Sequence, residues 1–337
     1  MTDFSTRIIV NAKISGIASY VPDDILDNEM LSKMVDTNDE WITTRVGIKE
    51  RRILHEDGKG SSWLGIKAVE KLLSETGTAP EEVDLLICAT SNPDYRFPST
   101  GSVIAYGTGL RNAYAYDIQA ACAGFLVTLQ AARAYIESGL YKKIIVVAAE
   151  KMSSMTDYED RATCPLFGDA AGAVMIEPTD EHVGIIDGEF HIDGSGLPHL
   201  LMKAGGSVLP ASHETVDARE HYIYQEGRAV YKHAVRDMLS STVSVMKRNN
   251  LTVEDVDWLV PHQANLRIIE AVSGRTGIAE EKVLVNIQHY GNTSAASIPL
   301  CLDEFKHRLK KGDKIMMTAF GAGFTWGAMY LIWAYDS

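Results

Sequence analysis

The sequence predicts an α/β fold built from two similar halves. Near-continuous apolar runs at 83–90 and 144–149 alternate with helix-like stretches, as expected for parallel strands that helices cover on both faces. The order of motifs also repeats. Asp84–Leu86 recurs as Asp257–Leu259, 173 residues later, and Asp117–Gln119 recurs as Asn286–Gln288, 169 residues later. A nearly constant offset of this length indicates a duplication rather than a solenoid. We therefore predict two domains, 1–180 and 181–337.

The first half is predicted to contain alternating strands and helices. β-Branched residues predict a strand within 8–20, and turn residues end the helix-like stretches. The charge run Lys49–Arg52 is interpreted as a solvated segment. In order, the expected elements are a strand at 8–20, helices at 28–34 and 61–76 (closed by Gly77), a strand at 83–90, a loop at 91–99, a helix at 100–109, a strand at 113–119, a helix at 125–138 and a strand at 144–149.

The second half is less regular at its start. A polar loop at 151–165 precedes a strand around 174–176, and the glycine-rich region 182–210 has no clear assignment. The glycines at 168–172 do not form GxGxxG and precede their strand, so they do not indicate a dinucleotide loop. A long helix is expected at 224–250, followed by strands at 258–260 and 314–319.

Composition limits the function classes. The 337 residues carry a net charge of −13, which disfavours bulk attraction to nucleic acid or anionic membranes. Four cysteines form neither a CxxC pair nor a metal-ligand spacing, which suggests a reducing compartment. There is no long apolar run of the kind found in signal peptides or membrane spans. We expect a cytoplasmic protein with no metal.

Cys122 is the candidate nucleophile. It lies among small residues in Ala120–Phe125, between a predicted strand and a predicted helix. A helix N-terminus favours a nearby anion, so the thiol is expected to ionise more readily than usual. The alternative is a small buried core cysteine. The residues near Cys122 do not decide between the two.

Polar residues elsewhere favour the catalytic interpretation. His262 follows the strand at 258–260, Asn292 is expected to follow another strand, and the glycines at 321 and 323 follow the strand at 314–319. Strand ends of parallel sheets share one crevice. With Cys122, these segments supply a nucleophile, an imidazole, an amide donor and free backbone N–H groups.

Five segments, 41–48, 121–125, 261–267, 291–297 and 320–327, resemble the β-ketoacyl-acyl carrier protein synthase III family, which initiates type II fatty-acid synthesis. The resemblance implies the thiolase-like fold, a duplicated αβαβα five-layer sandwich, and a homodimer. It implies that Cys122 takes an acyl group from acyl-CoA. Malonyl-acyl carrier protein then loses CO2, and the resulting enolate attacks the acyl-cysteine. CoA thioesters are substrates, and no cofactor is expected.

The same resemblance assigns roles to individual residues. The backbone N–H groups of Cys122 and Ala322 would bind the tetrahedral oxyanion, and the side chains of His262 and Asn292 would donate to the enolate. Phe97 would close the acyl pocket of the partner subunit. The residues implied for CoA are Thr37, Trp41, Arg45, Arg161 and Asn265, and those implied for the carrier protein are Gln263, Ala264, Asn265, Leu266, Arg267 and Lys232, with Arg236 nearby.

Some features depart from the family pattern. Ala322 stands where glycine is frequent, Arg228 stands near the tunnel where an amide is common, and the region 203–222 is longer than usual. Cys88, Cys164 and Cys301 are expected to be packing residues. Two alternatives stay open: a thiolase-fold enzyme making a quinolone, polyketide or hydrocarbon precursor, and a silent partner subunit. Primer length is not fixed by the sequence.

Overall fold

The computed structural model describes residues 10–336 and contains two main sheets. The first sheet has the order β1-β7-β6-β4-β5, and the second has the order β11-β12-β13-β8. Their strands are β1 (Asn11–Tyr20), β4 (Leu85–Ala89), β5 (Tyr114–Ile118), β6 (Ile144–Glu150), β7 (Ala170–Thr179), β8 (Gly184–Ile192), β11 (Trp258–Pro261), β12 (Lys314–Gly321) and β13 (Thr325–Ile332). The predicted boundary at 180 falls in the connection between β7 and β8.

The two sheets share one pattern of strand directions. In the first, β6 pairs with β4 in parallel and with β7 antiparallel; in the second, β12 pairs with β11 in parallel and with β13 antiparallel. The counterpart of β5 is reduced to a parallel bridge between Leu259 and Val283. The predicted duplication is therefore visible as the same topology in both halves.

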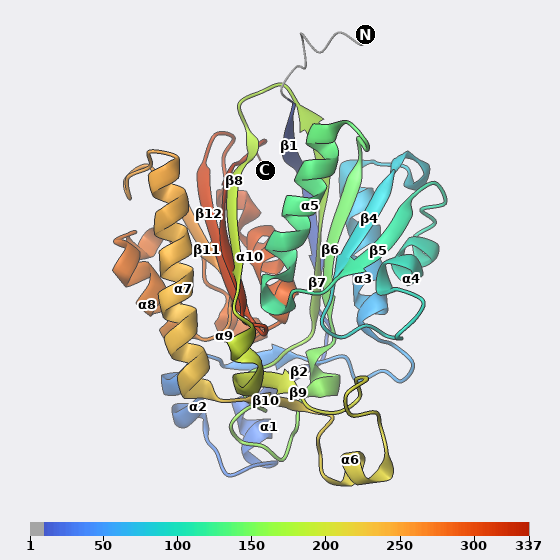
Figure 1. The fold of residues 1–337 in the computed structure, drawn as a ribbon, viewed down its shortest axis with the longest axis vertical. Coiled ribbons are helices and arrows are strands. Elements are labelled where there is room, and N and C mark those ends of the chain that lie inside the picture. The colour runs from blue at the N-terminus through green and yellow to red at the C-terminus, as the bar shows by residue number, and fades with distance from the viewer. Residues whose placement is uncertain (1–9, 337) are drawn as a thin grey trace.

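Helices and sheets alternate in five layers (Figure 1). Helices α3 (Ser61–Thr76) and α4 (Thr100–Gly107) cover the outer face of the first sheet, and α7 (Gly227–Arg248) and α8 (Leu266–Thr276) cover that of the second. Helices α5 (Gly124–Ser138) and α10 (Ser297–Phe305) lie between the sheets, and their apolar side chains join residues of both sheets in one core cluster. The α/β, thiolase-like αβαβα prediction is confirmed.

Smaller elements gather at one end of the sandwich (Figure 1). A separate cluster of buried side chains, including Leu31, Ile42 and Ile48, holds several of them together. These elements are β2 (Ile25–Asp27), α1 (Asn28–Ser32), α2 (Asp39–Val46), β3 (Glu50–Arg52), β9 (Leu200–Met202), α6 (His213–Asp217), β10 (Ile223–Gln225) and α9 (Ile287–Tyr290). Helix α2 begins where the Asn38 side chain accepts the Trp41 N–H, and it ends at Gly47 with φ +79°.

Some of the elements predicted from the sequence agree with the structure and others do not. Helix α3 spans the predicted 61–76 and ends at Gly77, whose φ of +64° suits glycine. The unassigned region 182–210 contains strand β8. The strand expected just before Asn292 is absent from the described residues, because residues 287–290 form α9. The solvated interpretation of Lys49–Arg52 is also wrong for Arg51, which is fully buried. Among residues 10–336, no helix combines the length and apolar character that a membrane span needs.

Candidate active site

Cys122 lies in a 3-10 turn, Ala121–Ala123, between β5 and α5. Small residues are required here, because a Cβ on Gly124 would lie 3.3 Å from the Ala89 Cβ and 3.4 Å from the Ala295 Cβ. Ala121 has φ +46°, a conformation that non-glycine residues rarely adopt outside strained functional segments. The small neighbours predicted from the sequence therefore permit close packing around the turn that carries the thiol.

Burial is the main influence on the ionisation of the Cys122 thiol. Residue 122 keeps partial solvent exposure, yet burial raises the pKa of its thiol to about 12. The expectation of easier ionisation is therefore wrong for this state, because desolvation of the sulfur outweighs the helix N-terminus. Attack on a thioester requires that the thiol first lose its proton to a neighbouring group.

The end of β12 lies directly against the Cys122 backbone. A Cβ on Gly321 would be 2.6 Å from the Cys122 nitrogen, so Ala322 follows within one residue of the nucleophile's N–H. Ala322 is not among the residues with positive φ, whereas the following Gly323 has φ +144°. The Cβ of Ala322 is thus accommodated without backbone strain, and the backbone donor that the sequence assigns there is retained.

His262 follows β11 and is held by main-chain and side-chain hydrogen bonds. Its backbone N–H donates to the Thr318 carbonyl (2.8 Å), and its Nδ1 pairs with Ser297 Oγ at 2.7 Å. Burial lowers the pKa of His262 to about 3, so the imidazole is neutral at physiological pH. Ser297 Oγ also accepts the Gln263 N–H (3.3 Å). In the tautomer whose Nδ1 accepts the Ser297 hydroxyl, the single ring proton is on Nε2, where it can donate.

Asn292 is oriented by its neighbour in the next turn. Its Oδ1 accepts the Ser294 N–H at 2.8 Å, and its backbone pairs with the segment 166–168 through an N–H bond to the Leu166 carbonyl (2.7 Å). Within the described residues, no hydrogen bond involves its Nδ2 group. The amide therefore has two free donors. Asn292 follows helix α9 rather than the strand that the sequence predicted.

One short segment connects the three candidate catalytic residues. Ser294 accepts a hydrogen bond from the Cys122 thiol (3.6 Å) and donates its backbone N–H to Asn292, while Ser297 pairs with His262. Sequence reasoning missed the roles of both serines. The available signal was their position in the motif 291–297, three residues apart and therefore on one side of a helical turn.

A buried carboxylate was also missed. The Ser294 hydroxyl donates to Glu150 Oε1 at 3.0 Å, and Glu150 is fully buried at the end of β6. Burial raises the pKa of Glu150 to about 7. No local pattern indicates this role, because Glu150 ends an ordinary apolar strand.

The residues implied for CoA gather around Trp41. The guanidinium carbon of Arg161 lies 4.9 Å from the centre of the Trp41 ring, and that of Arg45 lies 5.3 Å from it. Thr37 Oγ1 is buried without a hydrogen-bond partner among residues 10–336. Asn265 caps α8 by accepting the Arg267 N–H. A flat aromatic ring flanked by two guanidinium groups suits a nucleobase and phosphates.

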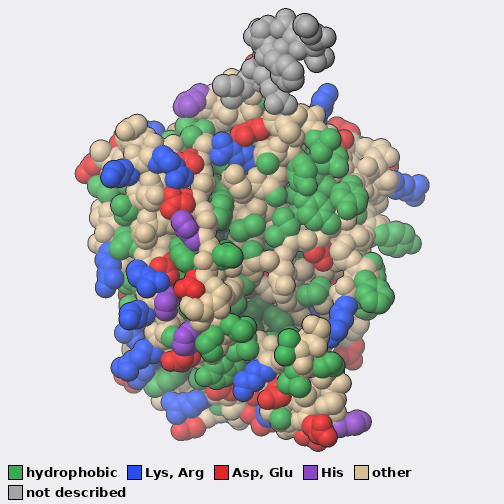
Figure 2. All heavy atoms as spheres, viewed as in Figure 1, with side chains coloured by type: hydrophobic (Ala, Val, Ile, Leu, Met, Phe, Trp, Pro, Cys, Tyr) green, Lys and Arg blue, Asp and Glu red, His purple; other side chains and the backbone are tan. Residues whose placement is uncertain are grey.

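The residues implied for the carrier protein separate into two groups. Arg267 and Lys232 are exposed on the packed helices α8 and α7, where blue side chains gather on the left of Figure 2. Ala264, Asn265 and Leu266 are half-buried. The Gln263 side chain is buried and bonds to the Pro261 carbonyl and the Asn286 N–H, so it holds the segment in place beneath the exposed residues. Arg236 is paired with Asp237 at 2.6 Å.

Two further features singled out in the sequence are Phe97 and the region 203–222. Phe97 is 87% exposed in the loop before α4, so it does not close a pocket in its own chain. Residues 203–222 form a flap with α6, tied to the segment carrying Arg161 by ion pairs from Arg219 to Asp157 and Glu159. Cys88, Cys164 and Cys301 are buried, as expected for packing residues.

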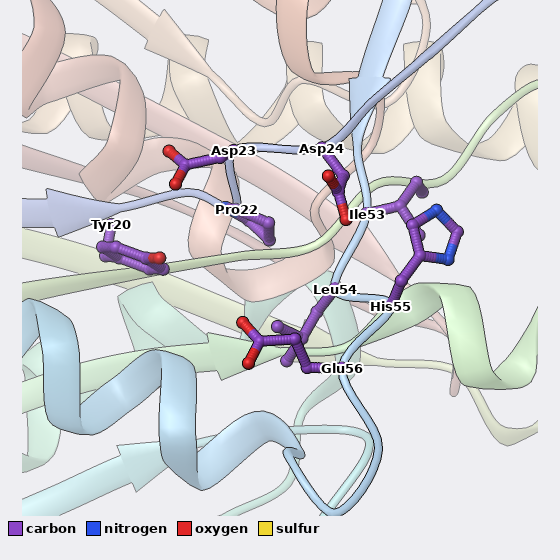
Figure 3. A pocket seen from close by; sticks show the side chains of 8 residues that line it. All are labelled: Tyr20, Pro22, Asp23, Asp24, Ile53, Leu54, His55 and Glu56. Atoms are coloured by element: carbon purple, nitrogen blue, oxygen red, sulfur yellow. The ribbon is translucent and has the colours of Figure 1, made fainter.

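A surface hollow of about 270 Å3 lies apart from these residues. Figure 3 shows its acidic side chains Asp23, Asp24 and Glu56. Cys122, His262 and Asn292 do not line it. Within residues 10–336, no group of three or more His, Cys, Asp or Glu side chains could hold a metal ion.

Residues 116–194 match the family described as "3-Oxoacyl-[acyl-carrier-protein (ACP)] synthase III", and residues 246–333 match its C-terminal part. A β-ketoacyl-[acyl-carrier-protein] synthase III of Porphyromonas gingivalis is 57% identical over 327 residues, which cover 97% of this chain and 98% of the relative. The chain belongs to the β-ketoacyl-[acyl-carrier-protein] synthase III family. Members of this family are acyl-condensing transferases, so the predicted family and enzyme class are confirmed.

Solved structures agree with this family assignment. The 3-oxoacyl-[acyl-carrier-protein] synthase III of Aquifex aeolicus superimposes with a TM-score of 0.88 at 42% identity, covering 96% of this chain and 100% of that one. The priming β-ketosynthase of the R1128 polyketide pathway superimposes with a TM-score of 0.89 at 32% identity, covering 99% and 100%. Xanthomonas campestris OleA, at 20% identity and a TM-score of 0.83 over 98% and 100%, shares the fold.

Proposed function

We propose that this protein is the initiating condensing enzyme of fatty-acid synthesis. It transfers an acyl group from a short acyl-CoA to Cys122 and condenses it with malonyl-acyl carrier protein, releasing CoA and CO2 and giving 3-oxoacyl-acyl carrier protein. The observation that carries the proposal is the single segment 294–297, which hydrogen-bonds to Cys122, His262 and Asn292. A nucleophile and two neutral donors on one support suit both half-reactions.

The first half-reaction is acyl transfer. The Cys122 sulfur attacks the thioester carbonyl, and the tetrahedral oxyanion is bound by the backbone N–H groups of Cys122 and Ala322. The contact between Gly321 and the Cys122 nitrogen supports this pairing of donors. Such a donor is worth roughly 3–4 kcal/mol where water is excluded.

The second half-reaction is decarboxylative condensation. Loss of CO2 from the malonyl group places negative charge on the thioester oxygen, and the enolate carbon then attacks the acyl-cysteine. A neutral imidazole with its proton on Nε2 and a free Asn292 amide are the donors that this oxygen requires. The lowered pKa of His262 supports a donor role rather than that of a charged acid.

We assign Trp41, Arg161, Arg45, Thr37 and Asn265 to CoA and the exposed cations Arg267 and Lys232 to the acidic carrier protein. The cation–ring distances at Trp41 support the first assignment. No cofactor beyond the CoA thioester enters this chemistry. The four free cysteines are consistent with a reducing, cytoplasmic setting.

The active form is proposed to be a homodimer. Strand β5 is at the edge of the first sheet, and Phe97, Tyr106 and Tyr114 are highly exposed nearby. An exposed edge with aromatic side chains is typical of an interface. Light scattering is expected to give twice the chain mass. Mixing Cys122→Ser with Phe97→Ala subunits tests whether Phe97 serves the partner's pocket.

Intact-mass analysis tests the proposed function. Wild type should gain one acyl group from acetyl-CoA or another short acyl-CoA, and Cys122→Ser should gain none. A series of chain lengths then identifies the primer. Failure of wild type to acylate with any acyl-CoA would refute the proposal and favour a silent subunit. A preference for malonyl-CoA over malonyl-acyl carrier protein would favour a polyketide-type or other specialised synthase.

A further inference from the structure

A chain of hydrogen bonds connects the nucleophile to a buried carboxylate. The Cys122 thiol donates to Ser294 Oγ at 3.6 Å, and the Ser294 hydroxyl donates to Glu150 Oε1 at 3.0 Å. Within residues 10–336, the thiol has no other side-chain hydrogen-bond partner. The Ser294 hydroxyl therefore bridges the sulfur and the carboxylate. Its oxygen accepts the thiol proton in one hydrogen bond and donates its own proton to Glu150 in the other.

Glu150 is held without a cation. It accepts hydrogen bonds from the Ser91 N–H (3.0 and 3.1 Å), from the Thr90 hydroxyl (3.3 Å) and from Ser294. No ion pair to it forms among the described residues, and the Nζ of the adjacent Lys151 donates instead to the Lys59 carbonyl. A buried carboxylate without a countercharge is costly to folding. Only Ser294 separates Glu150 from the nucleophile in the hydrogen-bond chain, which points to a functional role that offsets this cost.

His262 is less suited to receive the thiol proton. Its Nδ1 is already paired with Ser297, and burial lowers the pKa of the imidazole to about 3. Burial acts in the opposite direction on Glu150 and raises the pKa of that carboxyl to about 7. Of the two buried bases, the carboxylate therefore holds a proton far better at neutral pH.

We propose that Glu150, acting through the Ser294 hydroxyl, accepts the proton of the Cys122 thiol when the cysteine takes its acyl group. Ser294 touches the reacting sulfur. Glu150 does not, and it is a positioning residue that orients the hydroxyl and stores the proton. The acyl-transfer part of this inference rests on the proposed function.

The step balances as follows. The S–H proton of Cys122 moves to Ser294 Oγ as the hydroxyl's own proton moves to Glu150. The thiolate forms a bond to the acyl carbonyl carbon, and the bond from that carbon to the CoA sulfur breaks, with its electron pair leaving on CoA. The proton then returns from Glu150 through Ser294 to the CoA sulfur. Glu150 ends as a carboxylate, and CoA leaves as a neutral thiol.

Few titratable groups face Glu150. The thiols of Cys122 and of Cys88 on β4 lie close enough for the carboxylate to raise their pKa values. The other contacts, from Thr90 and Ser91 just after β4 and from the turn Ser294–Ala296, are hydroxyl and amide groups. A kinetic inflection near neutral pH is therefore expected to report on Glu150.

Alkylation by iodoacetamide tests the proton transfer without any acyl donor. With wild type, the rate at Cys122 should rise with pH to a plateau above about pH 7. With Glu150→Gln or Ser294→Ala, the plateau should vanish and the rate at pH 7 should fall roughly 10- to 100-fold. The double variant should be no slower than either single variant, because the two residues act as a unit. Thr128→Val, an isosteric change in the buried part of α5, should alkylate like wild type.

Faster alkylation of Cys122 in Glu150→Gln than in wild type would overturn the proposal. If Glu150 acts only as a negative charge near the sulfur, Glu150→Gln lowers the thiol pKa and alkylation becomes faster. Ser294→Ala leaves the carboxylate in place and keeps the test available if Glu150→Gln does not fold. An unchanged rate in Ser294→Ala would equally refute the relay.

Separated half-reactions distinguish this role from a structural one. Acetylation by acetyl-CoA, followed by intact mass, should slow in Glu150→Gln to the same extent as alkylation. Condensation of isolated acetyl-enzyme with malonyl-acyl carrier protein should stay within about 3-fold of wild type, because the thioester has no thiol proton. Equal losses in both half-reactions would refute the proposal. A wild type that alkylates as described but does not acetylate would contradict the proposed function and leave the proton transfer standing.

Discussion

Substitution of Asn292 by aspartate isolates one hydrogen-bond donor. Asn292 uses Oδ1 to accept the Ser294 N–H at 2.8 Å, and its Nδ2 has no partner within residues 10–336. Aspartate preserves the accepting oxygen and the side-chain shape, and it replaces the free NH2 by a second oxygen. The turn beside Cys122 should therefore keep its geometry, while the proposed enolate loses one donor.

The expected loss of condensation rate in Asn292→Asp follows from the loss of the Nδ2 donor. Removing one hydrogen bond to a developing oxyanion costs roughly 3–4 kcal/mol, or about 100- to 1000-fold in rate. The carboxylate also repels the enolate, so condensation should fall at least this far at pH 8. Acylation of Cys122 should change much less, because its oxyanion is assigned to backbone N–H groups.

The pH dependence adds a second signature. Asn292 is 7% exposed, and burial favours the neutral form of a carboxyl at this position. A protonated aspartic acid can donate a hydrogen bond, so the condensation rate of Asn292→Asp should rise relative to wild type as the pH falls. Asn292→Ala, which loses both the donor and the bond to Ser294, should show no such recovery.

Single-turnover mixing of isolated acetyl-enzyme with malonyl-acyl carrier protein measures the condensation rate. Intact-mass analysis after exposure to acetyl-CoA measures acylation of Cys122. A loss of less than 10-fold in condensation, or an equal loss in both steps, would refute the assignment of the Asn292 amide to the enolate.

Three other outcomes are expected. Trp41→Ala should raise the KM for acyl-CoA about 5- to 100-fold, since stacking of a base contributes about 1–3 kcal/mol; steady-state kinetics measure it, Trp63→Ala on α3 is the control, and an unchanged KM contradicts it. Arg267→Glu should raise the KM for malonyl-acyl carrier protein and leave acylation by acyl-CoA unchanged; equal effects on both substrates would contradict a carrier-protein contact. Burial raises the pKa of Glu150 to about 7 from an ordinary 4.5. The folded state therefore binds this proton more tightly than the unfolded state, and the resulting contribution to folding stability is present below about pH 4.5 and lost as the pH rises to 7. Glu150→Gln should therefore gain about 3 kcal/mol relative to wild type across this window, seen by thermal melting as roughly 4 °C; a pH-independent difference would contradict it.

Predictions from local patterns succeeded where the determinant is local. Gly77 ends α3 because glycine adopts the left-handed conformation that closes a helix. The position of Cys122 between strand and helix follows from its small neighbours. The strand expected before Asn292 was wrong because the second half does not copy the first there: β5 is replaced by a single bridge at Val283 and then by α9.

Features that depend on distant segments could not be predicted in this way. Arg51 lies in a charged run, but its guanidinium is buried and donates to the Pro165 carbonyl (2.6 and 3.0 Å) and to Asn28 Oδ1 (2.7 Å). These acceptors are 114 and 23 residues away in the chain. Glu150 and Ser294 are likewise 144 residues apart. Composition and periodicity carry no information about such pairs, so a buried polar partner is invisible until the fold joins the segments.

The segment 294–297 explains how one site can serve two reactions with different charges. Acyl transfer needs a proton removed from Cys122, and Ser294 provides the only side-chain hydrogen bond to the thiol within residues 10–336. Condensation needs donors that keep their protons, and the same segment fixes Asn292 and His262 through Ser294 N–H and Ser297 Oγ. Ser294 adopts φ +51°, a conformation rare for a serine. In this conformation its N–H bonds to Asn292 while its hydroxyl lies between Cys122 and Glu150. A substitution that relaxed this backbone would disturb both half-reactions together, whereas loss of the hydroxyl alone should disturb only the first.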